Sequence, residues 1–172
     1  MPKAPTDPDH IDGFLAEIRD KLPALDLSIE GIVDRINGIN RRIRRMLDET
    51  LSEHGLSSGE WHVLGSLSWS PTGRRTAGDL AQKTELSSAA MTNRLDRLEE
   101  AGLVKRVRDP EDRRSVLVEL TAKGKKLYER SVETQAAKES IVAAALSERE
   151  QQQLNDLLRK LMREFERRET SR

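Results

Sequence analysis

The chain has 172 residues, of which 35% are charged and 3% aromatic, and its formal net charge is zero. This length predicts one domain of ordinary size, or one compact domain with long extensions, and the neutral charge argues against indiscriminate nucleic-acid binding. The absence of cysteine excludes disulfides and thiolate zinc sites, and the lack of a long apolar run or an apolar leader predicts a cytoplasmic protein without membrane contact.

The N-terminal part predicts a short disordered segment followed by two helices. Residues 1–10 begin with a stretch rich in Pro and Asp, which is typical of disorder. Apolar residues at helical spacing then predict a short amphipathic helix ending at Pro23 and a long helix over 28–54, closed by Gly55. The stripe of the long helix consists of Ile32, Ile36, Ile39, Ile43, Met46 and Leu47.

A helix-turn-helix is predicted next. Ser57 and Glu60 form a capping box that opens a helix running to about Trp69. Residues 70–73 read as a turn, and residues 76–83 as the short first helix of the helix-turn-helix, with Leu80 and Ala81 facing inward.

The following helix has a face suited to DNA. Ser87 or Ser88 caps its start, an apolar stripe faces inward, and Gly102 ends it as a left-handed cap. Its other face offers the donors and acceptors that base edges and phosphates require. The candidate DNA contacts on this helix are Ser87, Ser88, Thr92, Asn93, Arg94 and Arg97.

A β-hairpin with a basic tip follows the helix. Residues 103–108 and 115–120 alternate apolar and polar side chains, as strands do, and residues 109–112 suit a type I turn. Arg113 and Arg114 at the hairpin edge are candidates for contact with the phosphate backbone or the minor groove. Each piece alone is more typical of a solvated surface, but together they predict a winged helix over residues 57–120.

The C-terminal part predicts two further helices. One runs from Thr121 to about Leu146, and the capping box of Ser147 and Glu150 opens the last one, with the apolar stripe Leu154, Leu157, Leu158, Leu161 and Phe165. Nothing obvious in a monomer covers the stripes of the terminal helices. We therefore expect a mainly α fold in which residues 11–56 and 121–168 form an intertwined dimerisation region; an elongated monomeric bundle is the alternative.

The run AAMTNRLDRLEEAGLVKRV, followed by DPEDRRSVLVELTAKG, resembles the DNA-binding core of the MarR family of bacterial transcription regulators. The likeness extends over about residues 30–168. It implies a winged helix-turn-helix homodimer that binds double-stranded DNA at a pseudo-palindromic operator, with half-sites about 10 bp apart. It also implies a repressor that a small aromatic or anionic ligand releases from the operator.

With its extra N-terminal helix and the arrangement DLS…GLSSGEWHVL…TNRLDRL, the chain resembles the branch of this family that includes urate-responsive members. That branch uses a Trp in the added helix, an acid just after the Trp of the family's second helix, and an Arg after the recognition helix. Ile18, His62 and Arg106 occupy these positions here. With Trp61 they are the candidate ligand contacts, and the two replacements favour a phenolic or carboxylated aromatic ligand over urate. The alternative is that Trp61 and His62 only pack.

Two other functional classes compete with a regulator. An architectural DNA-binding protein would bind most duplexes alike, whereas a regulator prefers a narrow operator. An enzyme would need catalytic motifs, but the sequence has no glycine elbow, phosphate loop or paired metal ligands. His10, His54 and His62 are scattered without metal-binding spacing, so we expect no metal, no catalytic residues and no cofactor apart from a small-molecule effector.

Overall fold

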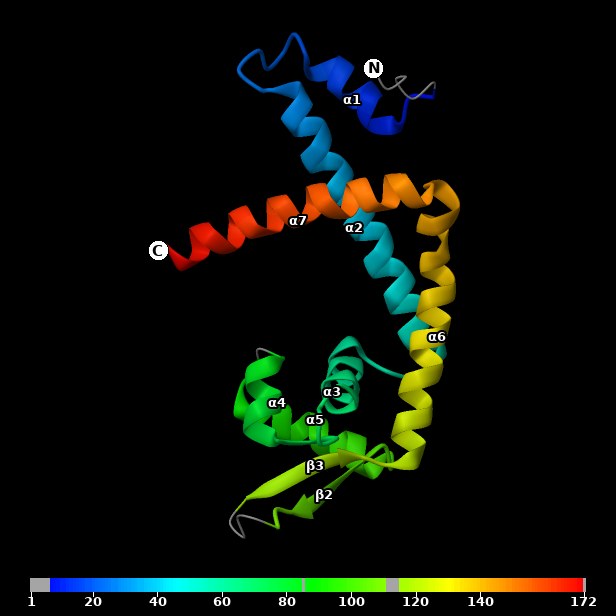
Figure 1. Ribbon diagram of the computed structural model, residues 1–172, viewed down its shortest axis with the longest axis vertical. Helices are drawn as coiled ribbons and strands as arrows, with labels where there is room; N and C mark the ends of the chain where they lie inside the picture. Colours follow the sequence, from blue (N-terminus) through cyan, green and yellow to red (C-terminus); the bar gives the residue numbers. More distant parts are fainter. Residues whose placement is uncertain (1–6, 85, 111–114, 172) are drawn as a thin grey trace. The chain divides into compact units, whose positions relative to one another are not determined.

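The computed structural model describes residues 7–84, 86–110 and 115–171, and Figure 1 shows their mainly helical fold with a small sheet. The predicted mainly α fold with a small β-hairpin is confirmed. The chain divides into two compact units, Met1–Glu49 and Thr50–Arg172. The elements in chain order are α1 His10–Ile18, α2 Leu27–Glu53, α3 Ser58–Ser68, β1 Arg74–Thr76, α4 Ala77–Lys83, α5 Ser88–Glu100, β2 Val104–Arg108, β3 Val116–Leu120, α6 Ala122–Ala145 and α7 Glu148–Thr170. No helix in the described ranges is long and apolar enough to cross a bilayer.

In the first unit, ion pairs of one arginine link α2 to the start of α1. Asp9 caps α1 through a capping box with Asp12. Arg35 of α2 donates to Asp9 at 3.0 Å and to Asp12 at 2.7 Å. The Arg35 guanidinium holds the pKa of Asp9 below its usual value. These ion pairs are solvent-exposed, so salt is expected to weaken the tie between α1 and α2.

The limits of α1 differ from the sequence prediction at both ends. Asp9 and His10 lie within the segment predicted to be disordered, yet they cap and begin the helix. The helix ends at Ile18 rather than near Pro23, because the amides of Lys21 and Leu22 both turn back onto the Ile18 carbonyl. The capping signal of Asp9 was present in the sequence and was missed.

The sheet of the second unit contains one strand more than predicted. Its order is β1-β3-β2, with both pairs antiparallel. The two predicted hairpin strands are confirmed, and they pair from Val104 opposite Leu120 to Arg108 opposite Val116. Glu111 and Asp112 of the predicted turn lie outside the described residues. The added strand β1 is only three residues long and reads Arg-Arg-Thr, so no apolar alternation marked it. Glu119 of β3 forms ion pairs with Arg74 and Lys105 on the two flanking strands.

The core of the second unit lies where α3, α4 and α5 meet the sheet (Figure 1). The predicted inward stripe of α5 is confirmed, because Met91, Leu95 and Leu98 are at most 1% exposed. The other fully buried apolar side chains come from α3, α4, β2 and β3: Val63, Leu64, Leu67, Leu80, Val104 and Val118. Burial of this stripe fixes which face of α5 remains in solvent.

The start of α6 docks onto the end of α5. The Thr121 hydroxyl donates to the Gly102 carbonyl at 2.7 Å, and Lys123 Nζ donates to the Ala101 carbonyl at 2.7 Å. Gly102 has a φ of 69°, which favours glycine and confirms the predicted end of the helix. At Gly124 a Cβ would lie 1.9 Å from the Leu103 carbonyl oxygen. Only a residue without a side chain permits this approach.

Polar contacts join the last turn of α2 and the residue that follows it to α6. The buried Thr50 hydroxyl donates to Gln135 at 3.0 Å, and His54 Nε2 lies 2.9 Å from the Thr134 hydroxyl. Lys138 adds an ion pair with Glu53 at 2.8 Å. Hydrogen bonds in a buried setting specify one alignment of packed helices more strictly than apolar contacts do.

Gly124→Ala is predicted to lower the free energy of unfolding by about 1–3 kcal/mol, because the new Cβ would force the Leu103 backbone to move. Gly78→Ala in α4 is the matched control, because a Cβ on Gly78 would lie 3.7 Å from its nearest neighbour, the Thr76 hydroxyl oxygen. This substitution lowers the conformational entropy of the unfolded chain and should stabilise the fold by about 0.5–1 kcal/mol. Urea unfolding followed by circular dichroism measures both. Equal effects of the two substitutions would contradict the close contact.

Candidate nucleic-acid interface

The helix α5 presents a polar face to solvent. Its N-cap is Ser87, whose hydroxyl accepts the amide of Ala90 at 3.3 Å. This decides between the two predicted caps. With its stripe buried, the exposed side chains of α5 include Ser88, Thr92, Asn93 and Arg97. A rigid helix with a free polar face has the form that enters the major groove.

Asn93 and Arg97 are the best placed of the predicted DNA contacts. They lie one turn apart on the exposed face, and neither makes a side-chain hydrogen bond or ion pair with any described residue. Thr92 instead donates its hydroxyl hydrogen to the Ser88 carbonyl at 2.9 Å, which leaves the hydroxyl oxygen as an acceptor. An amide and a guanidinium side by side offer both donors and acceptors to base edges.

Arg94 lies on the flank of α5 that faces α3, and it is half-buried. A Cβ on Gly59 of α3 would come within 2.2 Å of the Arg94 guanidinium, so the two are in close contact. Burial raises the pKa of Glu60, but hydrogen bonds from Ser57 and the charges of Arg97 and Arg94 bring it below its usual value. Arg94 therefore packs against α3, and its contact with DNA stays a prediction.

Arg106 of β2 lies on the other flank of α5. Its Nη2 donates to Asp96 at 2.6 Å and its Nη1 to Glu99 at 2.5 Å, while its backbone amide donates to Glu99 at 2.9 Å. The amide and guanidinium of Arg106 keep the pKa of Glu99 below its usual value, although burial raises it. The guanidinium predicted to meet a ligand is thus occupied by two carboxylates of α5.

The predicted wing contacts Arg113 and Arg114 lie outside the described residues. The structure describes the strands that lead to them, β2 up to Arg108 and β3 from Val116, and the amide of Asp109 donates to the Ser115 carbonyl at 3.2 Å just before the tip. The role of the two arginines on DNA stays a prediction.

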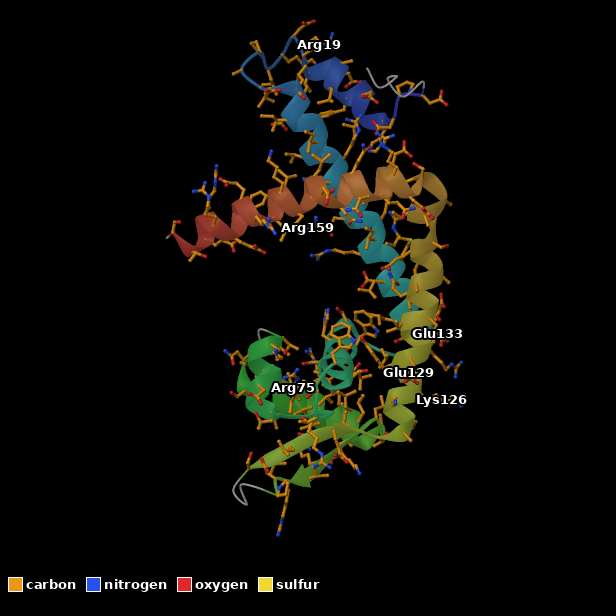
Figure 2. All side chains as sticks on the ribbon, viewed as in Figure 1. Arg19, Arg75, Lys126, Glu129, Glu133 and Arg159 are labelled. Carbon is orange, nitrogen blue, oxygen red and sulfur yellow. The ribbon has the colours of Figure 1, made fainter. Side chains whose placement is uncertain are left out.

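A cavity of about 410 Å³ lies among α3, β1 and α4. His62, which the sequence singled out, lines it; the sequence missed the other lining residues Ser66, Trp69, Arg75, Lys83 and Thr84. Figure 2 labels Arg75, whose Nε donates to the Ser66 carbonyl at 2.8 Å. The Ser66 hydroxyl is buried and has no hydrogen-bond partner among the described residues. These residues come from three separate elements, so their spacing in the sequence gave no signal.

Trp61 belongs to the contact between α3 and α6. Its indole Nε1 donates to the Ser131 hydroxyl at 2.9 Å, and its ring centre lies 5.8 Å from that of Tyr128 and 5.6 Å from that of His62. Trp69 also contacts Tyr128, with ring centres 6.3 Å apart. This geometry agrees with the alternative in which Trp61 packs.

Ile18 is the last residue of α1, in the first unit, and is half-buried there. Of the four predicted ligand contacts, the structure brings Trp61 and His62 together, while Arg106 is bound to α5. Within the described ranges, no group of three His, Asp or Glu side chains has the arrangement of a metal site.

Comparison with known proteins identifies the family to which this chain is similar. A sequence profile of the MarR family matches residues 54–115. The chain is 30% identical over 154 residues to the HTH-type transcriptional regulator PecS of Dickeya dadantii (strain 3937), covering 86% of this chain and 90% of PecS. It is 28% identical over 127 residues to the HTH-type transcriptional repressor YetL of Bacillus subtilis (strain 168), covering 72% of this chain and 76% of YetL.

A solved structure shares the fold and contains DNA. The S. aureus MepR F27L mutant bound to an oligodeoxyribonucleotide superposes with a TM-score of 0.61 at 25% identity, over 78% of this chain and 97% of that one. The fold, the exposed polar face of α5 and these relatives agree, and none of the relatives named is an enzyme. The chain belongs to the MarR family of DNA-binding transcription regulators, with a winged helix-turn-helix.

Proposed function

We propose that the protein is a homodimeric repressor that acts in the cytoplasm and is released from a pseudo-palindromic operator by a small aromatic anion. The observation that carries the DNA-binding part is the exposed pair Asn93 and Arg97 on a helix whose opposite face and both flanks are held in place. A repressor and a DNA complex among the relatives support the proposal.

Sequence preference is assigned to Asn93 and Arg97. A side-chain amide pairs with an adenine edge and a guanidinium with a guanine edge or a phosphate. Two copies related by a two-fold axis would present two such helices to half-sites about 10 bp apart. The operator is therefore expected to be an inverted repeat.

Asn93→Ala and Arg97→Ala are each predicted to weaken binding to the preferred duplex by about 1–3 kcal/mol. The preferred duplex is obtained by selection with the wild-type protein from a random-sequence pool, and binding is measured by fluorescence anisotropy against a scrambled duplex. Lys126→Ala, which removes an exposed cation from α6, is the control and should change little. A wild-type protein that binds both duplexes equally would favour an architectural role over regulation.

Dimerisation is inferred from two apolar faces that remain in solvent. The exposed face of α2 in the first unit consists of Ile29, Ile32, Val33, Ile36, Ile39 and Ile43. That of α7 consists of Leu154, Leu157, Leu158, Leu161, Met162 and Phe165, and no residue of α7 is buried. Apolar faces of this extent are characteristic of association, and a two-fold dimer is the simplest closed assembly that covers them.

Sedimentation equilibrium at micromolar concentration is predicted to give twice the chain mass of 19.5 kDa. Leu157→Glu combined with Leu161→Glu places charges on the apolar face of α7 and should shift the protein to monomer while α-helical circular dichroism is kept. Gln153→Glu adds a charge to an exposed polar position of α7 and should leave the dimer intact. A monomeric wild type would support the elongated bundle instead.

The cavity lined by His62, Trp69, Arg75 and Lys83 is the site proposed for the effector. An aromatic ring at its edge and two cationic side chains favour a small aromatic carboxylate. The buried Ser66 hydroxyl, which has no hydrogen-bond partner among the described residues, offers a further polar group. A ligand releases DNA only if it binds better to a conformation in which the recognition helices no longer match the groove.

Salicylate, a phenolic carboxylate, is predicted to bind the wild-type protein in isothermal titration calorimetry and to weaken its binding to the selected duplex. Lys83→Ala should reduce salicylate affinity about tenfold, because a charge-assisted contact is lost. Lys126→Ala again serves as the control. Urate, tested in parallel, should bind less well; equal salicylate affinity of wild type and Lys83→Ala would argue against this cavity.

A further inference from the structure

Arg106 links the strand β2 of the wing to α5. Its two terminal nitrogens reach different carboxylates, Asp96 at 2.6 Å and Glu99 at 2.5 Å, and its backbone amide reaches Glu99 as well. Asp96 and Glu99 are three positions apart, so they lie on the same side of the helix. The result is a contact with three hydrogen bonds between one residue of the strand and one flank of the helix.

The planar guanidinium makes this contact directional. Two N–H groups held in a fixed plane limit both rotation of α5 about its axis and its sliding along β2, which a single ammonium group does not do. The arginine is 31% exposed and the carboxylates 49% and 39%, so the bonds contribute little to global stability. Their effect is local, on the orientation of α5.

We infer that Arg106 is a positioning residue, which sets the angle of the recognition helix to the wing through Asp96 and Glu99 and touches neither DNA nor effector itself. The inference rests on the proposed DNA binding through α5. It replaces the ligand contact that the family resemblance implied for Arg106.

Substitution of Asp96 and Glu99 is expected to change DNA affinity in opposite directions, depending on whether the two carboxylates only repel DNA or orient α5. Removing negative charge from a DNA-binding helix strengthens DNA binding if electrostatics alone decides. If the carboxylates orient α5, Asp96→Asn combined with Glu99→Gln should weaken binding to the selected duplex about tenfold. Glu100→Gln is the matched control, because Glu100 is an exposed carboxylate on the same helix without an ion pair to any described residue; it should bind as tightly as wild type or more tightly.

Substitutions of Arg106 distinguish a positioning role from a direct contact with a DNA phosphate. Arg106→Ala and Arg106→Lys should both weaken binding about tenfold, since lysine keeps the charge but not the two-armed geometry. The slope of log K against log salt should be unchanged in both. A slope reduced by about 0.9 in Arg106→Ala, with binding restored in Arg106→Lys, would assign a phosphate contact and overturn the inference.

Hydrogen exchange of the DNA-free protein makes the test independent of DNA binding. Amides of α5 and β2 should exchange faster in Arg106→Ala and in the Asp96→Asn, Glu99→Gln variant than in wild type or Glu100→Gln. Unchanged exchange in both variants overturns the inference, as does tighter DNA binding of the double variant. Failure of the wild type to select any duplex refutes the proposed function instead, while the exchange comparison still decides the role of Arg106.

Discussion

The arrangement of the second unit depends on the contacts that orient α5. Its apolar stripe is sealed in the core, its end is joined to α6 where Gly124 meets the Leu103 carbonyl, and its flanks meet Gly59 through Arg94 and β2 through Arg106. Reading base edges requires side chains placed to within a fraction of an ångström, so a helix anchored at one point only would not suffice. These contacts separate Asp96 and Glu99, which bind Arg106, from Asn93 and Arg97, which make no side-chain hydrogen bond or ion pair with the described residues.

The sequence predicted the features of this unit that depend on local signals, but not those that depend on tertiary contacts. The winged helix, its helices and its hairpin could be predicted because apolar spacing, capping residues and glycine stops are local signals, and Ser57, Ser147 and Gly102 behave as expected. The same local signals could not separate Arg94 from Arg97. Both lie on the polar part of the helical pattern, and only the tertiary structure shows that Arg94 packs against Gly59 of α3 while Arg97 is exposed.

Apart from His62, the residues that line the candidate ligand cavity could not be predicted from the sequence. Trp69 follows the last residue of α3, Arg75 is the middle residue of β1 and Lys83 ends α4, so only the tertiary fold makes them neighbours. The strand β1 was missed for a related reason, since its three residues carry no alternation and pair with β3 through the backbone. Both the cavity and the strand β1 are therefore defined by tertiary packing, which the local sequence pattern does not encode. The family likeness assigned Arg106 to a ligand, but the geometry gives its guanidinium to Asp96 and Glu99.

The placement of the aromatic residues has a spectroscopic consequence. The chain has two tryptophans and one tyrosine, and both indole rings contact Tyr128. Intrinsic emission therefore originates at the boundary of α3 and α6, within the second unit. The segment 1–49 has no tryptophan or tyrosine. Loss of structure in α1 and in most of α2 would leave no direct trace in an emission-monitored melt, so a single transition seen by that probe would not establish that the two units unfold together.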